Sequence, residues 1–179
     1  MIISTEIGEF QGIPKTVFDR EIISASDEPD MAHGEKQCSG AYLGDLISRA
    51  WQAAVREGLL PEAFLEPRSL PEISDYLAGL NTGIPEAAAA REIARTMLRR
   101  AAKVAAILTA GPVLRSCAPG EYCTMVIEGS QYSKLTGFGP AFRQELAALL
   151  QPCGIGFEIT QVENSCLIGA ALAAFAEPM

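Results

Sequence analysis

The chain has 179 residues, of which 49% are hydrophobic and 20% are charged, so it is long and apolar enough to bury a core and is not a disordered composition. Its formal net charge of −8 disfavours phosphate backbones and anionic lipid, which argues against a nucleic-acid or membrane-surface protein. A nucleotide remains an allowed ligand, because backbone amides and helix ends supply local positive potential at any net charge.

The cysteine and histidine residues narrow the class of protein further. The five cysteines include no C-x-x-C pair, and the single histidine, His33, has no second ligand nearby, so we expect no metal site. An odd number of scattered cysteines predicts reduced thiols in a cytoplasmic protein. Residues 1–6 lack a basic leader, and the apolar stretches are too short to span a bilayer or are interrupted by Lys103. We expect His33 to be an exposed loop residue.

The N-terminal third combines a short β-rich run with an irregular stretch and a helix. Residues 1–7 predict a strand, and residues 8–34, with many Gly, Pro, Asp and Ser, predict a loop with one short segment near Val17 and Phe18. Apolar residues then recur at helical spacing over residues 42–55, and Gly58 follows as the expected C′ residue.

The middle of the chain predicts a short helix and a long one. Residues 60–84 are polar and contain several prolines, with a short helix near residues 71–80. Pro85 and Glu86 are typical of a first helical turn, and Gly111 and Pro112 are expected to end this second long helix. Its expected buried stripe is Ile93, Met97, Ala101, Val104 and Leu108, and its expected solvent side is Arg91, Arg95, Arg99 and Lys103.

The last third alternates strands and helices. Residues 122–128 carry apolar side chains on both faces, which is typical of an interior strand. Pro140 opens an expected helix, residues 155–159 alternate as a second strand, and residues 166–175 form an apolar helix. This β-α-β-α order predicts a parallel pair of strands. Neither a G-x-x-x-x-G-K-[ST] nor a G-x-G-x-x-G motif occurs, so motif spacing alone leaves a soluble α/β domain of unassigned function.

Four segments, in order and spacing, carry a resemblance to a known family. They are IISTEIGEF (residues 2–10) followed by FDREI (18–22), GEKQCSGAYLGDL (34–46), VIEGSQY (126–132) and the terminal GAAL (169–172). The first resembles the asparagine-threonine-glutamate-tryptophan-glycine-alanine-phenylalanine stretch of hexokinases. The second is similar to the E-K-x-x-S-G-x-Y-x-G-E-L helix entry of that family, and the third to its D-G-S-x-Y turn. The whole chain therefore resembles a hexokinase.

The resemblance implies an α/β fold of the actin-like ATPase (ribonuclease H-like) class, of which residues 1–179 would be a single domain from the C-terminal, larger-domain half. It implies that Glu6 and Glu35 contact the sugar, because ionised carboxylates accept strong hydrogen bonds from hydroxyls. It also implies that Gly129 and Ser130 contact the adenosine of ATP. Without the family match, Glu6 and Glu35 would be interpreted as surface carboxylates. Gly129 and Ser130 would be interpreted as an ordinary turn at the end of a strand.

The sequence also departs from the family pattern. The tryptophan after the first glutamate is Ile7, and the glutamine three positions before the second glutamate is Ala32. Ser165, Cys166 and Leu167 stand where animal hexokinases have a glycine-serine-glycine loop. Together these departures affect the nucleotide loop and the sugar specificity, and they look more like a bacterial branch of the family. The family's aspartate base, its lysine and threonine on the sugar and its two phosphate loops would all precede Met1. We therefore expect hexose and adenosine contacts but negligible turnover.

Two functions follow from these observations. The first is the C-terminal domain of an ATP-dependent hexose kinase that phosphorylates the 6-hydroxyl of a glucose-like sugar, with ATP and Mg²⁺ bound in the intact enzyme. The second is a non-catalytic sugar-binding or regulatory domain derived from a hexokinase, which the altered segment at residues 165–167 suggests. An unrelated α/β binding module is a third possibility. The expected partners are the missing N-terminal part of a hexokinase or, in its absence, further copies of this chain, because a parallel sheet requires cover on both faces.

Overall fold

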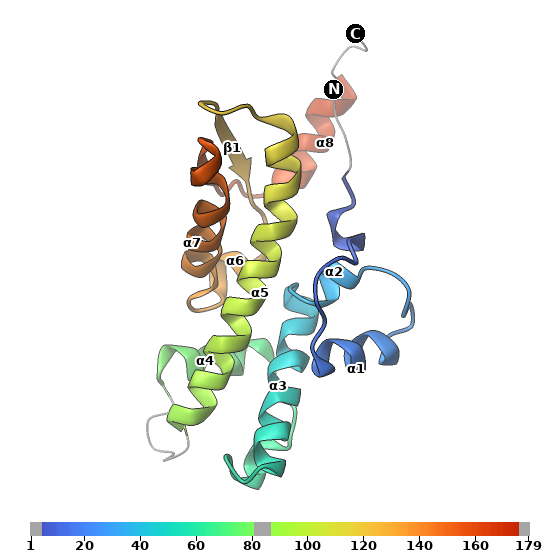
Figure 1. Ribbon diagram of the computed structural model, residues 1–179, viewed down its shortest axis with the longest axis vertical. Helices are drawn as coiled ribbons and strands as arrows, with labels where there is room; N and C mark the ends of the chain where they lie inside the picture. Colours follow the sequence, from blue (N-terminus) through green and yellow to red (C-terminus); the bar gives the residue numbers. More distant parts are fainter. Residues whose placement is uncertain (1–4, 81–86, 176–179) are drawn as a thin grey trace.

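A helix of 30 residues, α5 (Ala87–Ser116), runs along the long axis of the computed structural model, and most other elements lie beside it (Figure 1). The structure describes residues 5–80 and 87–175. The remaining elements, in chain order, are η1 (Ile7–Glu9), α1 (Val17–Ala25), α2 (His33–Lys36), α3 (Gly40–Arg56), η2 (Glu62–Phe64), α4 (Leu70–Ala78), β1 (Tyr122–Val126), α6 (Ser130–Lys134), α7 (Phe138–Leu150), η3 (Gln151–Cys153), β2 (Gly156–Thr160) and α8 (Ser165–Phe175).

Residues 5–36 are more helical than the sequence predicts. Residues 5 and 6 are not in a strand, and Ile7 opens a 3-10 helix; the earlier part of the expected strand lies outside the described residues. The expected loop contains α1, whose N-terminus is a capping box: the Thr16 hydroxyl accepts from the Asp19 amide, and the Asp19 carboxylate accepts from the Thr16 amide. This box satisfies two backbone donors that would otherwise lack partners.

Helices α3 and α4 form where the sequence predicts them, and they build an aromatic core against α5. Trp51 is fully buried and makes edge contacts with Phe64 and Tyr76, both at 5.3 Å between ring centroids. Its indole Nε1 donates to the Ala90 carbonyl of α5 at 2.8 Å. Gly58 follows α3 at a φ of 71°, which confirms its predicted role as the C′ residue. The N-terminal half is therefore anchored on α5.

Helix α5 confirms its predicted buried stripe except at Ile93, which is half-buried, and it does not confirm the predicted end. Met97, Ala101, Val104 and Leu108 are buried. Gly111 and Pro112 do not stop the helix, which continues to Ser116 with Pro112 inside it. Ala110 and Val113 around the proline are buried, so burial of apolar side chains stabilises this last turn in spite of the missing proline N–H. The expected start at residues 85 and 86 lies outside the described residues.

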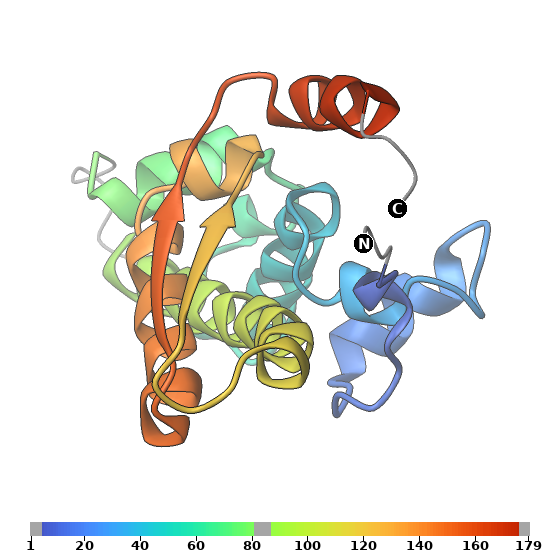
Figure 2. The ribbon, with the colours of Figure 1, turned by 90° about the horizontal axis from the view of Figure 1, so that it is seen from above.

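The two strands pair in parallel, as predicted, with Tyr122 opposite Gly156 and Val126 opposite Thr160. Cys123 and Met125 face the helices, whereas Tyr122, Thr124 and Val126 are exposed. The prediction that both faces of this strand are covered is therefore wrong, because only one face of β1 is covered. Helix α7 begins at Phe138, two residues before the predicted Pro140. The apolar helix α8 stands apart from the strands at the end of an extended segment (Figure 2), and its side chains are exposed. The chain is thus an α/β arrangement with helices beside a small parallel sheet.

Candidate functional site

The segments that carry Glu6 and Glu35 pack directly against each other. Gly34 in α2 lies so close to η1 that an added Cβ atom would be 3.0 Å from the Gly8 carbonyl oxygen and 3.2 Å from that of Phe10. The Ala32 amide donates to the Glu9 carboxylate at 2.7 Å across the same junction. A larger residue at position 34 would force η1 to shift by a few tenths of an ångström, so the glycine permits the close approach of the two predicted sugar-contacting segments.

Glu6 is the residue before η1, with a left-handed φ of 43° and an exposed side chain. The prediction that it ends a strand is wrong for the residues that the structure describes. Glu6 lines a groove of about 520 Å³ between η1 and the last turns of α5, whose other walls include Phe10, Leu108 and Pro112. The groove is thus mostly apolar, and its lining includes the carboxylate residues Glu6 and Glu9.

Glu35 is the third residue of α2, which agrees with the prediction that it begins a helix. Its side chain is exposed and lies against Gly8: a Cβ atom added to Gly8 would be 3.3 Å from the Glu35 Cβ and 3.7 Å from its Oε2. The structure therefore brings the Glu35 carboxylate to the segment that begins at Glu6, although Glu35 does not line the groove that Glu6 lines.

The neighbours of Glu35 in the chain are unusually well buried. Lys36 is 3% exposed, and its ammonium donates to the carbonyls of Glu28 and Met31. Burial and, to a lesser extent, the nearby Glu35 carboxylate together raise the pKa of the Cys38 thiol from 9.0 to about 12, against the opposing charge of Arg100. His33 is not an exposed loop residue: it opens α2, is half-buried, and its Nε2 lies 2.7 Å from the Pro29 carbonyl oxygen.

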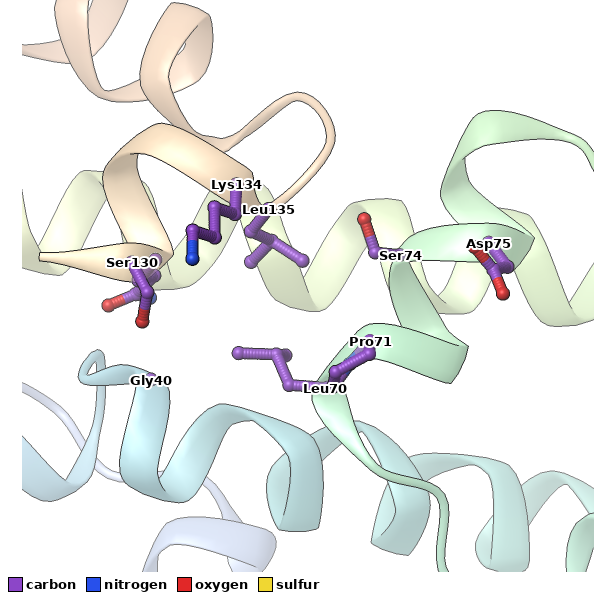
Figure 3. Close-up of a pocket in the computed structure, with 9 residues that line it drawn as sticks. Gly40, Leu70, Pro71, Ser74, Asp75, Ser130, Lys134 and Leu135 are labelled. Carbon is purple, nitrogen blue, oxygen red and sulfur yellow. The ribbon is translucent and has the colours of Figure 1, made fainter.

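The predicted adenosine turn lies at the start of α6. Gly129 has a φ of 139°, a conformation that side-chain-bearing residues rarely adopt, and Ser130 is the first residue of the helix. Ser130 lines a cavity of about 490 Å³ that is shown in Figure 3. Lys134 and Leu135 project into it from above, Leu70 and Pro71 come from the start of α4, and Gly40 lies below Ser130. Gly129 lines a neighbouring cavity of about 390 Å³.

A direct hydrogen bond joins the two predicted sites. The Gln131 side-chain amide donates to the Cys38 carbonyl at 2.7 Å, and a Cβ atom added to Gly40 would be 3.3 Å from the Gln131 Cβ. Gln131 follows the predicted Gly129 and Ser130, and Cys38 lies three residues after Glu35. Gln131 lies in one of the segments that resemble the family, residues 126–132. The sequence alone does not predict its role, because its hydrogen-bond partner is 93 residues away in the chain.

The altered segment at residues 165–167 is the N-terminus of α8, and a carboxylate caps it. Glu128 accepts from the Ser165 hydroxyl at 2.5 Å and from the Cys166 amide at 3.0 Å. The hydrogen bonds from Ser165 and then Cys166 lower the pKa of Glu128 below its usual range. The negative charge also interacts favourably with the positive end of the α8 dipole.

The described residues include neither a candidate metal site nor a helix that could span a membrane. Within residues 5–80 and 87–175, His, Cys, Asp and Glu side chains form no group of three or more that could hold a metal ion. Over the same residues, none of the helices combines the length and the apolar character that crossing a membrane requires.

The sequence matches the family described as hexokinase over residues 1–176. Among solved structures, a hexokinase from Schistosoma mansoni complexed with glucose superposes with a TM-score of 0.67 at 23% identity, over 89% of this chain and 41% of that one. A second hexokinase crystal structure gives a TM-score of 0.68 at 20% identity, over 86% of this chain and 39% of that one. No curated protein matches significantly.

The chain therefore belongs to the hexokinase family, a family of sugar kinases, and it has the fold of the matching part of those enzymes. This agrees with the predicted actin-like ATPase class and excludes the unrelated α/β module. The chain spans about two fifths of the length of the solved hexokinases that it resembles.

Proposed function

We propose that residues 1–179 form the C-terminal, ligand-contacting portion of an ATP-dependent kinase that phosphorylates the 6-hydroxyl of a glucose-like hexose. Family membership and the glucose bound to the Schistosoma mansoni hexokinase support the substrate class. The observation that carries the proposal is the packing of α2 against η1, which places Glu35 beside the segment that begins at Glu6.

Glu6 and Glu35 are proposed to accept hydrogen bonds from the sugar hydroxyls. Both carboxylates are exposed, so a ligand can reach them, and both lie on elements whose backbones contact each other. An ionised carboxylate has two oxygens that can each accept a hydroxyl, and charge-assisted hydrogen bonds are stronger than neutral ones. Two such groups on adjoining segments can orient a ring with several hydroxyls.

Gly129 and Ser130 are proposed to contact adenosine. The cavity beside Ser130 combines apolar walls from Leu70, Pro71 and Leu135 with the Lys134 ammonium and the Asp75 carboxylate. Its volume of about 490 Å³ falls within the range of small-molecule sites. Such a lining suits a flat aromatic ring whose edges carry hydrogen-bonding groups.

The groups for phosphoryl transfer itself are proposed to come from the part of a hexokinase that this chain does not span. That part would supply the base for the sugar hydroxyl and the loops that, with Mg²⁺, hold the phosphates of ATP. The chain alone is then expected to bind ligands with negligible turnover. The five cysteines, which are free thiols, support a reducing, cytoplasmic location.

The sugar contacts can be tested by titrating the chain with glucose and following the amide spectrum by NMR. Replacing Glu6 or Glu35 with Ala should weaken binding by about 1.5–3 kcal/mol, the range for a hydrogen bond to a charged group. The exposed Glu57, at the end of α3, is a matched control, and Glu57→Ala should leave the affinity unchanged. Wild-type affinity in both Glu6→Ala and Glu35→Ala would refute the assignment.

The second candidate is a non-catalytic hexose-binding or regulatory domain derived from a hexokinase. The Glu128 carboxylate at the N-terminus of α8 favours it, because the group capping those amides is already an anion. A titration with ATP separates the two functions: perturbation of residues 129–135 supports the kinase, whereas glucose binding without any nucleotide binding supports the alternative.

A further inference from the structure

An ion pair between the buried Asp19 and the partly buried Arg100 joins α1 to α5. The Asp19 side chain is 1% exposed, and the Arg100 guanidinium donates to both of its oxygens, at 3.0 Å to Oδ1 and 2.7 Å to Oδ2. The Thr16 hydroxyl donates to the same carboxylate at 2.7 Å. The Asp19 carboxylate is therefore fully paired, and the Arg100 guanidinium has one orientation.

The same guanidinium also reaches α2. Its Nη2 donates to the Gln37 Oε1 at 2.9 Å, and the Gln37 Nε2 donates to the His33 carbonyl at 3.2 Å. Gln37 is fully buried and comes directly after α2. Arg100 thus forms a polar connection between α5 and the helix that carries Glu35.

Helix α2 needs such a connection because it has only four residues. A single helical turn has too few internal hydrogen bonds to hold itself, so its position depends on tertiary contacts. A carboxylate that orients a ligand must keep its place within about 0.5 Å. The two hydrogen bonds from Arg100 to Asp19 orient the guanidinium, and its hydrogen bond to Gln37 anchors the residue two positions beyond Glu35.

We propose that Arg100 is a positioning residue for hexose binding, which acts through Gln37 to hold Glu35 in place. This role rests on the proposed function, in which Glu35 accepts the sugar hydroxyls. Arg100 does not itself contact the sugar. Its charge is neutralised by Asp19, and its contribution is the geometry of α2.

The decisive variant is Gln37→Leu in the full chain, because it removes the connection to α2 and leaves the Asp19–Arg100 pair intact. Removing Arg100 outright would bury an unpaired aspartate and could unfold the protein. Gln37→Leu should weaken glucose binding about fivefold or more, a coupling typical of residues in one hydrogen-bond network. Arg100→Lys, which keeps the charge but lacks the guanidinium fork, should weaken it similarly.

A double-mutant cycle with Glu35→Gln separates positioning from general destabilisation. If Gln37 acts through Glu35, then Gln37→Leu should change glucose affinity less than about twofold in the Glu35→Gln background. The matched control is Arg49→Gln, which breaks the 2.9 Å pair between α1 and α3 without touching α2 and should leave the affinity within about twofold.

The outcomes distinguish this role from the proposed function. If the wild-type chain binds no glucose up to molar concentration, the sugar site is wrong and the positioning role fails with it. If the wild-type chain binds but Gln37→Leu binds equally well, the positioning role alone is wrong. If Gln37→Leu weakens binding by the same factor with and without Glu35→Gln, the effect does not pass through Glu35, and the role is also overturned.

Discussion

The pKa of the Cys38 thiol depends on its burial and on the nearby Glu35 carboxylate. It is buried at the end of α2, its Sγ lies 3.3 Å from the Gly34 carbonyl, and burial together with the Glu35 carboxylate raises its pKa to about 12. Thiolate, rather than thiol, is the reactive form of cysteine. Cys38 should therefore be almost inert in the folded chain.

Alkylation with iodoacetamide at pH 8, followed by peptide mapping, should show this contrast. The exposed Cys153 and Cys166 should react quickly, and Cys38 should react about a thousandfold more slowly than a thiol with the ordinary pKa of 9.0. Unfolding in urea should equalise the rates. Equal rates for Cys38 and Cys153 in the native chain would mean that α2 does not enclose the thiol as described.

At the residue scale, the site could be predicted only in part. The family resemblance identifies Glu6 and Glu35 as candidate site residues, and the structure places their segments in contact. Their roles in sugar binding remain predictions. Arg100 and Gln37 could not be found in this way, because Arg100 lies 81 residues from Asp19 and 63 from Gln37. A pairing that depends on how α5 lies against α1 and α2 leaves no local pattern in the sequence.

At the element scale, a carboxylate from within the helix caps the N-terminus of α4, and a carboxylate from 37 residues earlier in the chain caps that of α8. Glu72 accepts from the Ser69 hydroxyl at 2.6 Å and amide at 2.9 Å at the start of α4. Glu128 does the same for Ser165 and Cys166 at the start of α8. Hydrogen bonds from the capped residues lower the pKa of both carboxylates. Helix α4 is packed into the core, whereas α8 is exposed, so only α8 should depend heavily on its cap.

Helix α8 should therefore unwind in acid before α4 does. Because the pKa of Glu128 is lower in the folded state, the stabilisation is complete above the unfolded value of about 4.3 and is lost as the pH falls through the lower folded value. Secondary Cα shifts of residues 165–175 should decrease over that range. Glu128→Gln should reproduce the loss at pH 7, and Glu72→Gln should leave α8 unchanged. Unaltered α8 shifts in Glu128→Gln would contradict the capping role.

The elements themselves show where local patterns suffice. Regular apolar spacing predicts α3 and α7, and alternation predicts β2, because each buries one face against a neighbour. The sequence does not predict helix α1, although Thr16 and Asp19 form a capping box, because the glycine and proline before it indicate a loop. The end of α5 was misplaced because burial of Val113 outweighs the proline at 112.

At the scale of the whole molecule, helix α8 exposes an apolar surface that the rest of the described chain does not cover (Figure 2). Leu167, Leu172 and Phe175 of α8 are 72%, 67% and 86% exposed, and Tyr122 and Val126 of β1 are 66% and 53% exposed. Contiguous exposed apolar surface usually marks an interaction site. In a hexokinase of full length, the portion that this chain does not span would be available to cover it.

The isolated chain should therefore self-associate through α8. Static light scattering should give a mass that rises with concentration above that of one chain, because association buries the exposed leucines. Leu167→Lys with Leu172→Lys should shift the chain toward the monomer. Leu59→Lys is the matched control: Leu59 is 66% exposed, and the C-terminal end of α3 beside it lies at the opposite end of the long axis from α8 (Figure 1). A wild-type chain that stays monomeric at high concentration would contradict the prediction and show that the exposed face of α8 is tolerated in water. If Leu59→Lys reduces association as much as the α8 double variant does, the association does not depend on α8.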